Sequence, residues 1–200
     1  RHEPLNLSEA KQAVLAYADS GRYGDDLRTV SEKAKAWVIE RSGQAKPDER
    51  LAVVFDVDET VLSNLPHMRE MDFGYVVEPW SQWVALADAP AIVPVREVYD
   101  ECRRRGVAVI FITGRKEPQD RRGTARNLLR EGMGDYAQLI LALPAESGMT
   151  TVVRKARARA AVERNEGYRI IASIGDQWSD LEGGSAERVF KLPNPFYQIP

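Results

Sequence analysis

Short apolar runs alternate with longer segments of helical periodicity along most of the chain. The first run covers 51–57, and comparable runs follow at 107–113, 138–143, 169–174 and 188–192. Continuous runs of this length are typical of strands buried on both faces of a parallel sheet. Between them, apolar residues recur at helical spacing over 94–105, 119–131 and 151–165, with Gly106 and Gly167 where helices should end. The pattern predicts an α/β fold, with a mostly parallel, doubly wound sheet flanked by helices and joined by right-handed crossovers.

Two segments lie outside this alternation. Residues 1–46 precede the first strand and predict two helices, one capped by Ser8 and one beginning near Asp25. Residues 63–91 lie between the first strand and the next helix, and we expect them to form an insertion over the edge of the sheet. At 200 residues the chain fits one domain, 1–200, that includes both segments.

The composition excludes several classes of protein. Hydrophobic residues make up 44% and charged residues 29%, which is ordinary for a globular chain. The net charge of −2 provides no bulk attraction to a nucleic-acid polymer or an anionic membrane. No apolar run approaches the about 18 residues of a membrane span, and a single cysteine, Cys102, excludes a framework of internal disulfides. An anionic substrate would therefore need a local arrangement of charges or a bound cation.

Polar residues gather at the expected carboxyl ends of the strands, where ligands bind in open α/β sheets. The side chains concerned are Asp56 and Asp58 after the first strand, Thr113, Gly114 and Arg115 at the second, Asp176 and Asp180 after the fourth, and Lys155 near the start of the preceding helix. Carboxylates this close raise one another's pKa unless a counter-charge is present. Oxygen-only ligands favour Mg²⁺, so the sequence predicts a magnesium site.

Two of these carboxylates suggest a reaction. Asp56 as a nucleophile needs an electrophile, and a phosphoryl group held by Mg²⁺ and Lys155 is a suitable one. Asp58, two residues later, would protonate the leaving oxygen and then deprotonate the water that cleaves the acyl-phosphate. The residues therefore predict phosphoryl transfer through an aspartate.

Four motifs, at Phe55–Leu62, Ile112–Arg115, Lys155 and Ile174–Asp180, resemble those of the haloacid dehalogenase (HAD) superfamily. The string from Gly175 to Asp180 is similar to the acid phosphatase branch, subfamily IIIB, which includes class B and class C (lipoprotein-type) bacterial enzymes and plant vegetative storage proteins. The resemblance implies a HAD-like, Rossmann-type sheet. It also implies a small cap formed by 63–91 and the N-terminal helices.

The resemblance also implies roles for individual residues. Asp56 would be the nucleophile and Asp58 the general acid and base, with Thr113 and Lys155 as further catalytic residues. Thr113, Gly114, Arg115, Lys155 and His67 would contact the substrate. The Mg²⁺ ligands would be Asp56, the backbone carbonyl of Asp58, and Asp176, with Asp180 holding them in place. The implied activity is Mg²⁺-dependent hydrolysis of small phosphomonoesters, nucleotides among them, through an aspartyl-phosphate.

Several alternatives stay open from the residues alone. Lys155 competes with its basic neighbours Arg154, Arg157 and Arg159, and such a run usually forms a solvated helix face. Trp80 and Trp83 would pack the insertion onto the body of the protein or stack on a substrate ring. The protein as a whole could be a storage or binding protein that lost its activity, or another phosphotransferase or phosphomutase of the superfamily.

The resemblance bears on location as well. Relatives are mostly exported, as periplasmic, lipid-anchored or secreted proteins. The chain begins with Arg1 rather than Met, so we expect that an upstream segment such as a signal peptide was removed.

Overall fold

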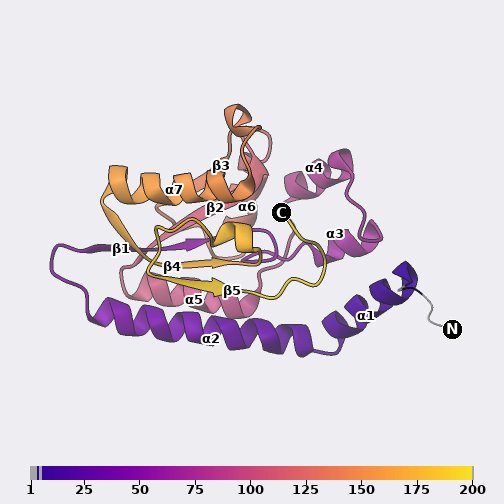
Figure 1. Ribbon diagram of the computed structural model, residues 1–200, viewed down its shortest axis with the longest axis horizontal. Coiled ribbons are helices and arrows are strands. Elements are labelled where there is room, and N and C mark those ends of the chain that lie inside the picture. The colour runs from indigo at the N-terminus through magenta and orange to yellow at the C-terminus, as the bar shows by residue number, and fades with distance from the viewer. Residues whose placement is uncertain (1–3, 5, 200) are drawn as a thin grey trace.

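Five parallel strands form the central sheet, in the order β3-β2-β1-β4-β5. The computed structural model describes residues 4 and 6–199 (Figure 1). Its strands are β1 (Arg50–Phe55), β2 (Ala108–Lys116), β3 (Gln138–Ala142), β4 (Tyr168–Gly175) and β5 (Arg188–Lys191). The order places β1 at the centre, with its apolar residues buried on both faces. The predicted doubly wound α/β sheet is therefore confirmed, with every expected strand present.

Helices cover both faces of this sheet (Figure 1). They include α2 (Arg22–Gly43) and α5 (Val93–Arg104) on one face and α7 (Thr151–Glu166) on the other. The remaining elements are α1 (Leu7–Asp19), which extends from the start of α2 beyond the sheet, α6 (Arg121–Arg130) and the short 3₁₀ turns η1 (Pro144–Glu146) and η2 (Trp178–Asp180). Alternate strand residues serve the two faces, as the period of a strand requires. Val53 and Phe55 pack in the same cluster as the buried residues of α2 and α5, whereas Ala52 and Val54 pack with Val162 of α7.

The N-terminal helices differ in detail from the sequence prediction. The cap of α1 is Asn6 rather than Ser8, because the Asn6 Oδ1 atom accepts the Ser8 N–H at 2.9 Å. Asn and Ser are equally good N-caps, and Asn6 and Ser8 are only two residues apart, so the sequence alone does not distinguish them. Helix α2 begins at Arg22 instead of Asp25, since Gly21 adopts a left-handed φ of 87° and turns the chain within two residues.

The insertion expected at 63–91 contains α3 (Leu65–Glu70) and α4 (Val77–Leu86), which lie beyond the carboxyl ends of the strands (Figure 1). Helix α4 packs closely on α6, since a Cβ atom at Gly123 would lie 2.2 Å from the Val84 carbonyl oxygen. Helix α1 contacts the same region through the ion pair of Lys11 with Asp72 at 2.6 Å. The insertion is thus attached to both the body and the N-terminal segment.

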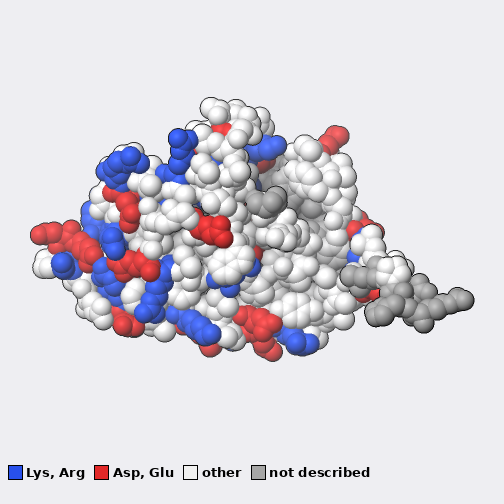
Figure 2. All heavy atoms as spheres, viewed as in Figure 1, with Lys and Arg blue, Asp and Glu red and all other residues white. Residues whose placement is uncertain are grey.

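Acidic and basic side chains are intermixed on the face shown in Figure 2. Most of them lie over the half of this face that holds α7 and the carboxyl-terminal part of α2, and the half around α4 is nearly free of charge (Figures 1 and 2). In the described part of the chain, every helix is too short or too polar to cross a membrane.

Candidate active site

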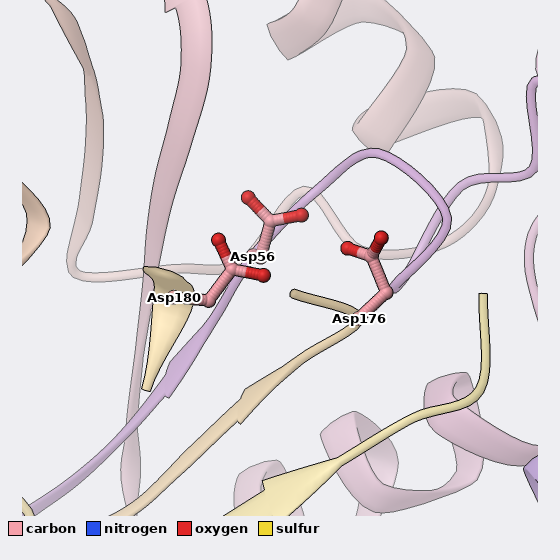
Figure 3. Close-up of side chains that lie close together, drawn as sticks. All are labelled: Asp56, Asp176 and Asp180. Atoms are coloured by element: carbon pink, nitrogen blue, oxygen red, sulfur yellow. The ribbon is translucent and has the colours of Figure 1, made fainter. Parts of the chain in front are cut away.

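Three buried carboxylates meet at the carboxyl ends of β1 and β4. Figure 3 shows Asp56 following β1, and Asp176 and Asp180 following β4, with one oxygen from each within 4.8 Å of the others. Gly175 makes this approach possible, since a Cβ atom there would lie 2.5 Å from the Cβ atom of Asp180. Of the four carboxylates predicted to converge at this edge, Asp56, Asp176 and Asp180 form this cluster.

Lys155 lies within this acidic cluster. Lys155 lies on α7 and is 3% exposed. Its ammonium group donates to Asp180 Oδ1 at 2.5 Å and to Asp56 Oδ1. Burial alone would lower the pKa of Lys155, but the two carboxylates raise it above its ordinary value. Burial raises the pKa of Asp56 well above the usual range, and the charge of Lys155 opposes that shift. The site therefore carries more negative charge than one lysine can balance.

Asp176 is held by polar partners from three segments. Its carboxylate accepts from Thr60 Oγ1 at 3.2 Å and from the amides of Gln177 and Asn194, each at 2.7 Å. Burial and the charge of Asp180 raise the pKa of Asp176. Three oriented carboxylates with excess negative charge fit a hard divalent cation, which takes oxygen ligands. Asp56, Asp176 and Asp180 could thus hold a metal, whereas the Asp58 side chain lies outside this set.

The Asp58 carboxylate is bound by Arg115 from β2. Arg115 Nη2 and Nε lie 2.8 Å and 3.0 Å from Asp58 Oδ1, and the Asn64 amide donates to the same oxygen at 2.8 Å. Burial of Asp58 favours its neutral form, but the charge and hydrogen bonds of Arg115 outweigh this and lower its pKa. Thr113 Oγ1 lies 3.4 Å from Asp58 Oδ2, so the predicted second motif does reach the first.

Arg115 makes further hydrogen bonds within the site, and its contact with a substrate stays a prediction. Its remaining Nη1 donor bonds Thr124 Oγ1 at 3.1 Å, and its backbone N–H donates to Thr113 Oγ1 at 3.1 Å. Its side chain is 1% exposed. Arg115 therefore orients Asp58 in this structure, and Gly114 is the exposed member of the motif.

The aromatic residues of the insertion border the same site. The His67 ring stacks on Trp83, with centroids 5.6 Å apart, and lies 5.9 Å from the Trp80 ring. The Trp83 indole N–H donates to Asn64 Oδ1 at 2.8 Å, and the Arg115 guanidinium lies 5.7 Å from the Trp80 ring centroid. Trp83 also packs against the main hydrophobic core, so both tryptophans contact the body of the protein. Contact of His67 with a substrate stays a prediction.

Glu59 and Asn64 are two site residues that sequence reasoning missed. Glu59 accepts from the Asn64 side-chain amide at 3.0 Å and from the Tyr197 hydroxyl at 3.1 Å. Burial, with the nearby charge of Asp58, raises the pKa of Glu59 to about 8. The position of Asn64, soon after the first motif, was the one signal available, and Tyr197 is too distant in sequence to connect with it.

Comparison with known proteins agrees with this geometry. The family model described as HAD superfamily, subfamily IIIB (Acid phosphatase), matches residues 4–200. Acid phosphatase 1 of Solanum lycopersicum is 37% identical over 96% of this chain and 75% of its own length. The corresponding values are 35%, 96% and 75% for the Stem 28 kDa glycoprotein of Glycine max, and 33%, 98% and 74% for Vegetative storage protein 1 of Arabidopsis thaliana.

A solved structure confirms the fold. The class C acid phosphatase of Bacillus anthracis with tungstate bound superposes with a TM-score of 0.79 at 24% identity, over 95% of this chain and 85% of that one. The family model and the tomato relative confirm the resemblance found in the sequence motifs and the expectation of a phosphate-ester hydrolase. The chain belongs to the acid phosphatases of HAD superfamily subfamily IIIB.

Proposed function

We propose that this protein is a Mg²⁺-dependent phosphomonoesterase that hydrolyses small phosphate esters through an aspartyl-phosphate on Asp56. The observation that carries the proposal is the buried cluster of Asp56, Asp176 and Asp180 around Lys155. Mg²⁺ held by the three carboxylates would supply positive charge that lets an anionic phosphate approach them.

The chain's own residues account for both halves of the reaction. A carboxylate oxygen of Asp56 attacks phosphorus, and the ester P–O bond breaks as Asp58 gives a proton to the leaving oxygen. Because the pKa of Asp58 is lowered, this step uses the fraction of the enzyme in which Asp58 is protonated, and that fraction grows as the pH falls. Thr113 and the Gly114 N–H bind phosphate oxygens, and Lys155 offsets developing charge. Asp58 then removes a proton from water, which attacks phosphorus and frees Asp56 with release of inorganic phosphate.

The test compares wild type with Asp56→Asn on a chromogenic phosphate ester. We expect hydrolysis by wild type to stop with a chelator, to return with Mg²⁺, and to be absent in Asp56→Asn. Asp48→Asn, which removes an exposed carboxylate from a loop, is the matched control and should keep full activity. Acid-quenched wild type should carry one phosphoryl group on Asp56 by mass spectrometry. Equal rates for wild type and Asp56→Asn would reject the proposal.

The substrate range is proposed to be broad, covering small phosphomonoesters including nucleotides. The insertion is small, and Trp80 beside Arg115 offers an aromatic surface near the reacting groups. A panel of aryl, alkyl and nucleoside monophosphates should give kcat/KM values within about two orders of magnitude of one another. One ester preferred far beyond that range would contradict a broad specificity.

A storage role is the second candidate, because two relatives are named vegetative storage proteins and are 33% and 32% identical to this chain. The presence of Asp56 at the nucleophile position favours activity. A wild-type rate no higher than that of Asp56→Asn would favour the storage role.

Export of the protein is proposed as well. Relatives named stem glycoproteins, 35% identical to this chain, support it, since glycoproteins follow the secretory route. Fractionation of cells that produce the natural protein should place the phosphatase activity outside the cytoplasm.

A further inference from the structure

Arg154 is a buried guanidinium without a partner in the described part of the chain. The residue is 6% exposed, yet no hydrogen bond or ion pair joins its side chain to any residue among 4 and 6–199. Burial lowers the pKa of Arg154, as expected for a cation removed from water. In the described part of the chain, its nitrogens are not among the fully buried polar atoms that lack a partner, so they reach solvent and are free to bind an anionic ligand.

Two other buried arginines show what satisfied sites look like in this protein. Arg159 donates to the backbone carbonyls of Gly184 at 3.0 Å, Asp180 at 2.5 Å, and Glu182. Arg115 uses its donors on Asp58 and Thr124, as described above. The free donors of Arg154 are therefore a feature of this residue and not of buried arginines here in general.

The location of Arg154 points to the phosphate. A Cβ atom at Gly114 would lie 3.9 Å from Arg154 Nη2, so the guanidinium lies beside the motif proposed to hold phosphate oxygens. Asp56 and Asp180 are near enough to favour its charged form. The charge of Glu146 also favours the charged form of Arg154. The Glu146 carboxylate, however, accepts the Leu143 N–H at 2.9 Å and makes no hydrogen bond to Arg154.

Lys155, the neighbouring cation, differs from Arg154 because its charge is already paired with carboxylates. Both of its carboxylate partners lie within hydrogen-bond distance, so its charge is largely balanced before any substrate arrives. Arg154 is the adjacent side chain whose charge is not balanced in this way. A planar guanidinium also offers parallel donors that match two oxygens of one phosphate.

We infer that Arg154 is a substrate-binding residue, whose guanidinium binds oxygens of the phosphoryl group seated at Thr113 and Gly114. The inference rests on the proposed function, because it assigns a further contact within that site. It also changes the interpretation of the basic run 154–159, since Arg154 and Lys155 both serve the site, Arg159 ties α7 to the loop after β4, and Arg157 is exposed.

The test measures binding of inorganic phosphate by calorimetry to the Mg²⁺-loaded protein. We expect Arg154→Gln to raise the Kd of phosphate, and the KM for a phosphate ester, roughly tenfold or more. Arg154→Lys should recover part of the lost affinity, because lysine keeps the positive charge but lacks the parallel donors of the guanidinium. Arg157→Gln removes an exposed guanidinium from the same helix and should behave as wild type.

Thermal unfolding separates binding from a structural role. Since Arg154 makes no internal hydrogen bond to the described residues, Arg154→Gln without phosphate should melt at the wild-type temperature or above it. The rise in Tm that phosphate gives wild type should shrink in the variant. A lowered Tm without phosphate together with an unchanged Kd would assign Arg154 a structural role and overturn the inference.

The outcomes also distinguish this inference from the proposed function. Unchanged phosphate affinity in Arg154→Gln, with Asp56→Asn inactive, would reject the role of Arg154 and leave the phosphatase proposal standing. Weakened phosphate binding in Arg154→Gln, with no hydrolysis by wild type, would uphold Arg154 as an anion-binding residue and reject the phosphatase proposal. If Arg154→Gln fails to fold, the Kd of Arg154→Lys decides the question.

Discussion

The Asp58 carboxylate and the Arg115 guanidinium form a forked ion pair, in which Nη2 and Nε of Arg115 lie 2.8 Å and 3.0 Å from one carboxylate oxygen. The fork fixes the plane of the carboxyl group that is proposed to protonate the leaving oxygen. A lysine at position 115 would keep a positive charge but lose this orientation.

We therefore expect Arg115→Lys to lower kcat/KM by roughly 10²-fold for alkyl phosphates, which need a proton on the leaving oxygen. The loss should be much smaller for p-nitrophenyl phosphate, whose leaving group is stable as an anion. The measurement is the dependence of kcat/KM on leaving-group pKa, which should become steeper in the variant. A uniform loss across all esters would show that Arg115 supports the structure only.

A substitution at Trp83 tests the positioning of the Asp58 carboxyl group through a smaller change. Its indole N–H holds Asn64, whose amide in turn donates to Asp58. Trp83→Phe keeps the stacking on His67 but removes this N–H, so we expect a severalfold drop in kcat/KM for alkyl esters.

Trp37→Phe is the matched control, since the Trp37 indole also donates at 2.8 Å, to the carbonyl of Ile171 away from the site. It should leave the leaving-group dependence unchanged. Equal effects of the two substitutions on that dependence would contradict a positioning role for Trp83.

Gly175 should tolerate no side chain. In Gly175→Ala the new Cβ atom would meet the Cβ and Oδ2 atoms of Asp180 at 2.5 Å and 2.6 Å, so Asp180 or the end of β4 must move. We expect a loss of about 1–3 kcal/mol in the free energy of unfolding and a large loss of activity. Gly43→Ala, at the end of α2 with open space around the new atom, should instead be neutral or stabilising by urea unfolding.

Glu187 should make stability depend on pH. Its carboxylate bonds Arg41 and Arg169, each at 2.8 Å from Nε; burial opposes ionisation, but these bonds and charges lower the pKa of Glu187 overall. A lowered pKa in the folded state contributes stability that is present above the ordinary glutamate pKa and is lost as pH falls through the folded-state value. Glu187→Gln should thus be less stable by about 1 kcal/mol near pH 7.

The difference between wild type and Glu187→Gln should disappear as the pH falls below about 4. Denaturant unfolding at a series of pH values measures it. A difference that is the same at pH 7 and in strong acid would show that charge has no part in it.

The strands and the acidic cluster were predictable because they depend on local pattern and on one general rule. Apolar runs mark buried parallel strands, and the carboxyl ends of such strands meet at one edge. Asp56 and Asp176 follow directly from these two facts, and Lys155 follows from its position in the helix before β4.

Arg154 and Asn64 were beyond the reach of that reasoning. Whether Arg154 or Arg157 faces the site depends on how α7 is rotated against the sheet, and a run of basic residues hides that rotation. Asn64 matters because Trp83, Glu59 and Asp58 all meet it, and these contacts form only when the insertion is folded onto the body. The ion pair of Arg115 with Asp58 could not be predicted either, because it joins two strands that are far apart in the sequence.

The segment after β5 contacts two of the motifs, because Tyr197 donates to Glu59 of the first and Asn194 donates to Asp176 of the fourth. The groups of the reaction are therefore in place only once chain regions 138 positions apart have come together. Catalytic turnover should accordingly be a stringent reporter of complete folding, since a partly folded chain with an intact sheet would still be silent. Recovery of turnover during refolding should coincide with the last structural phase and not with formation of the helices.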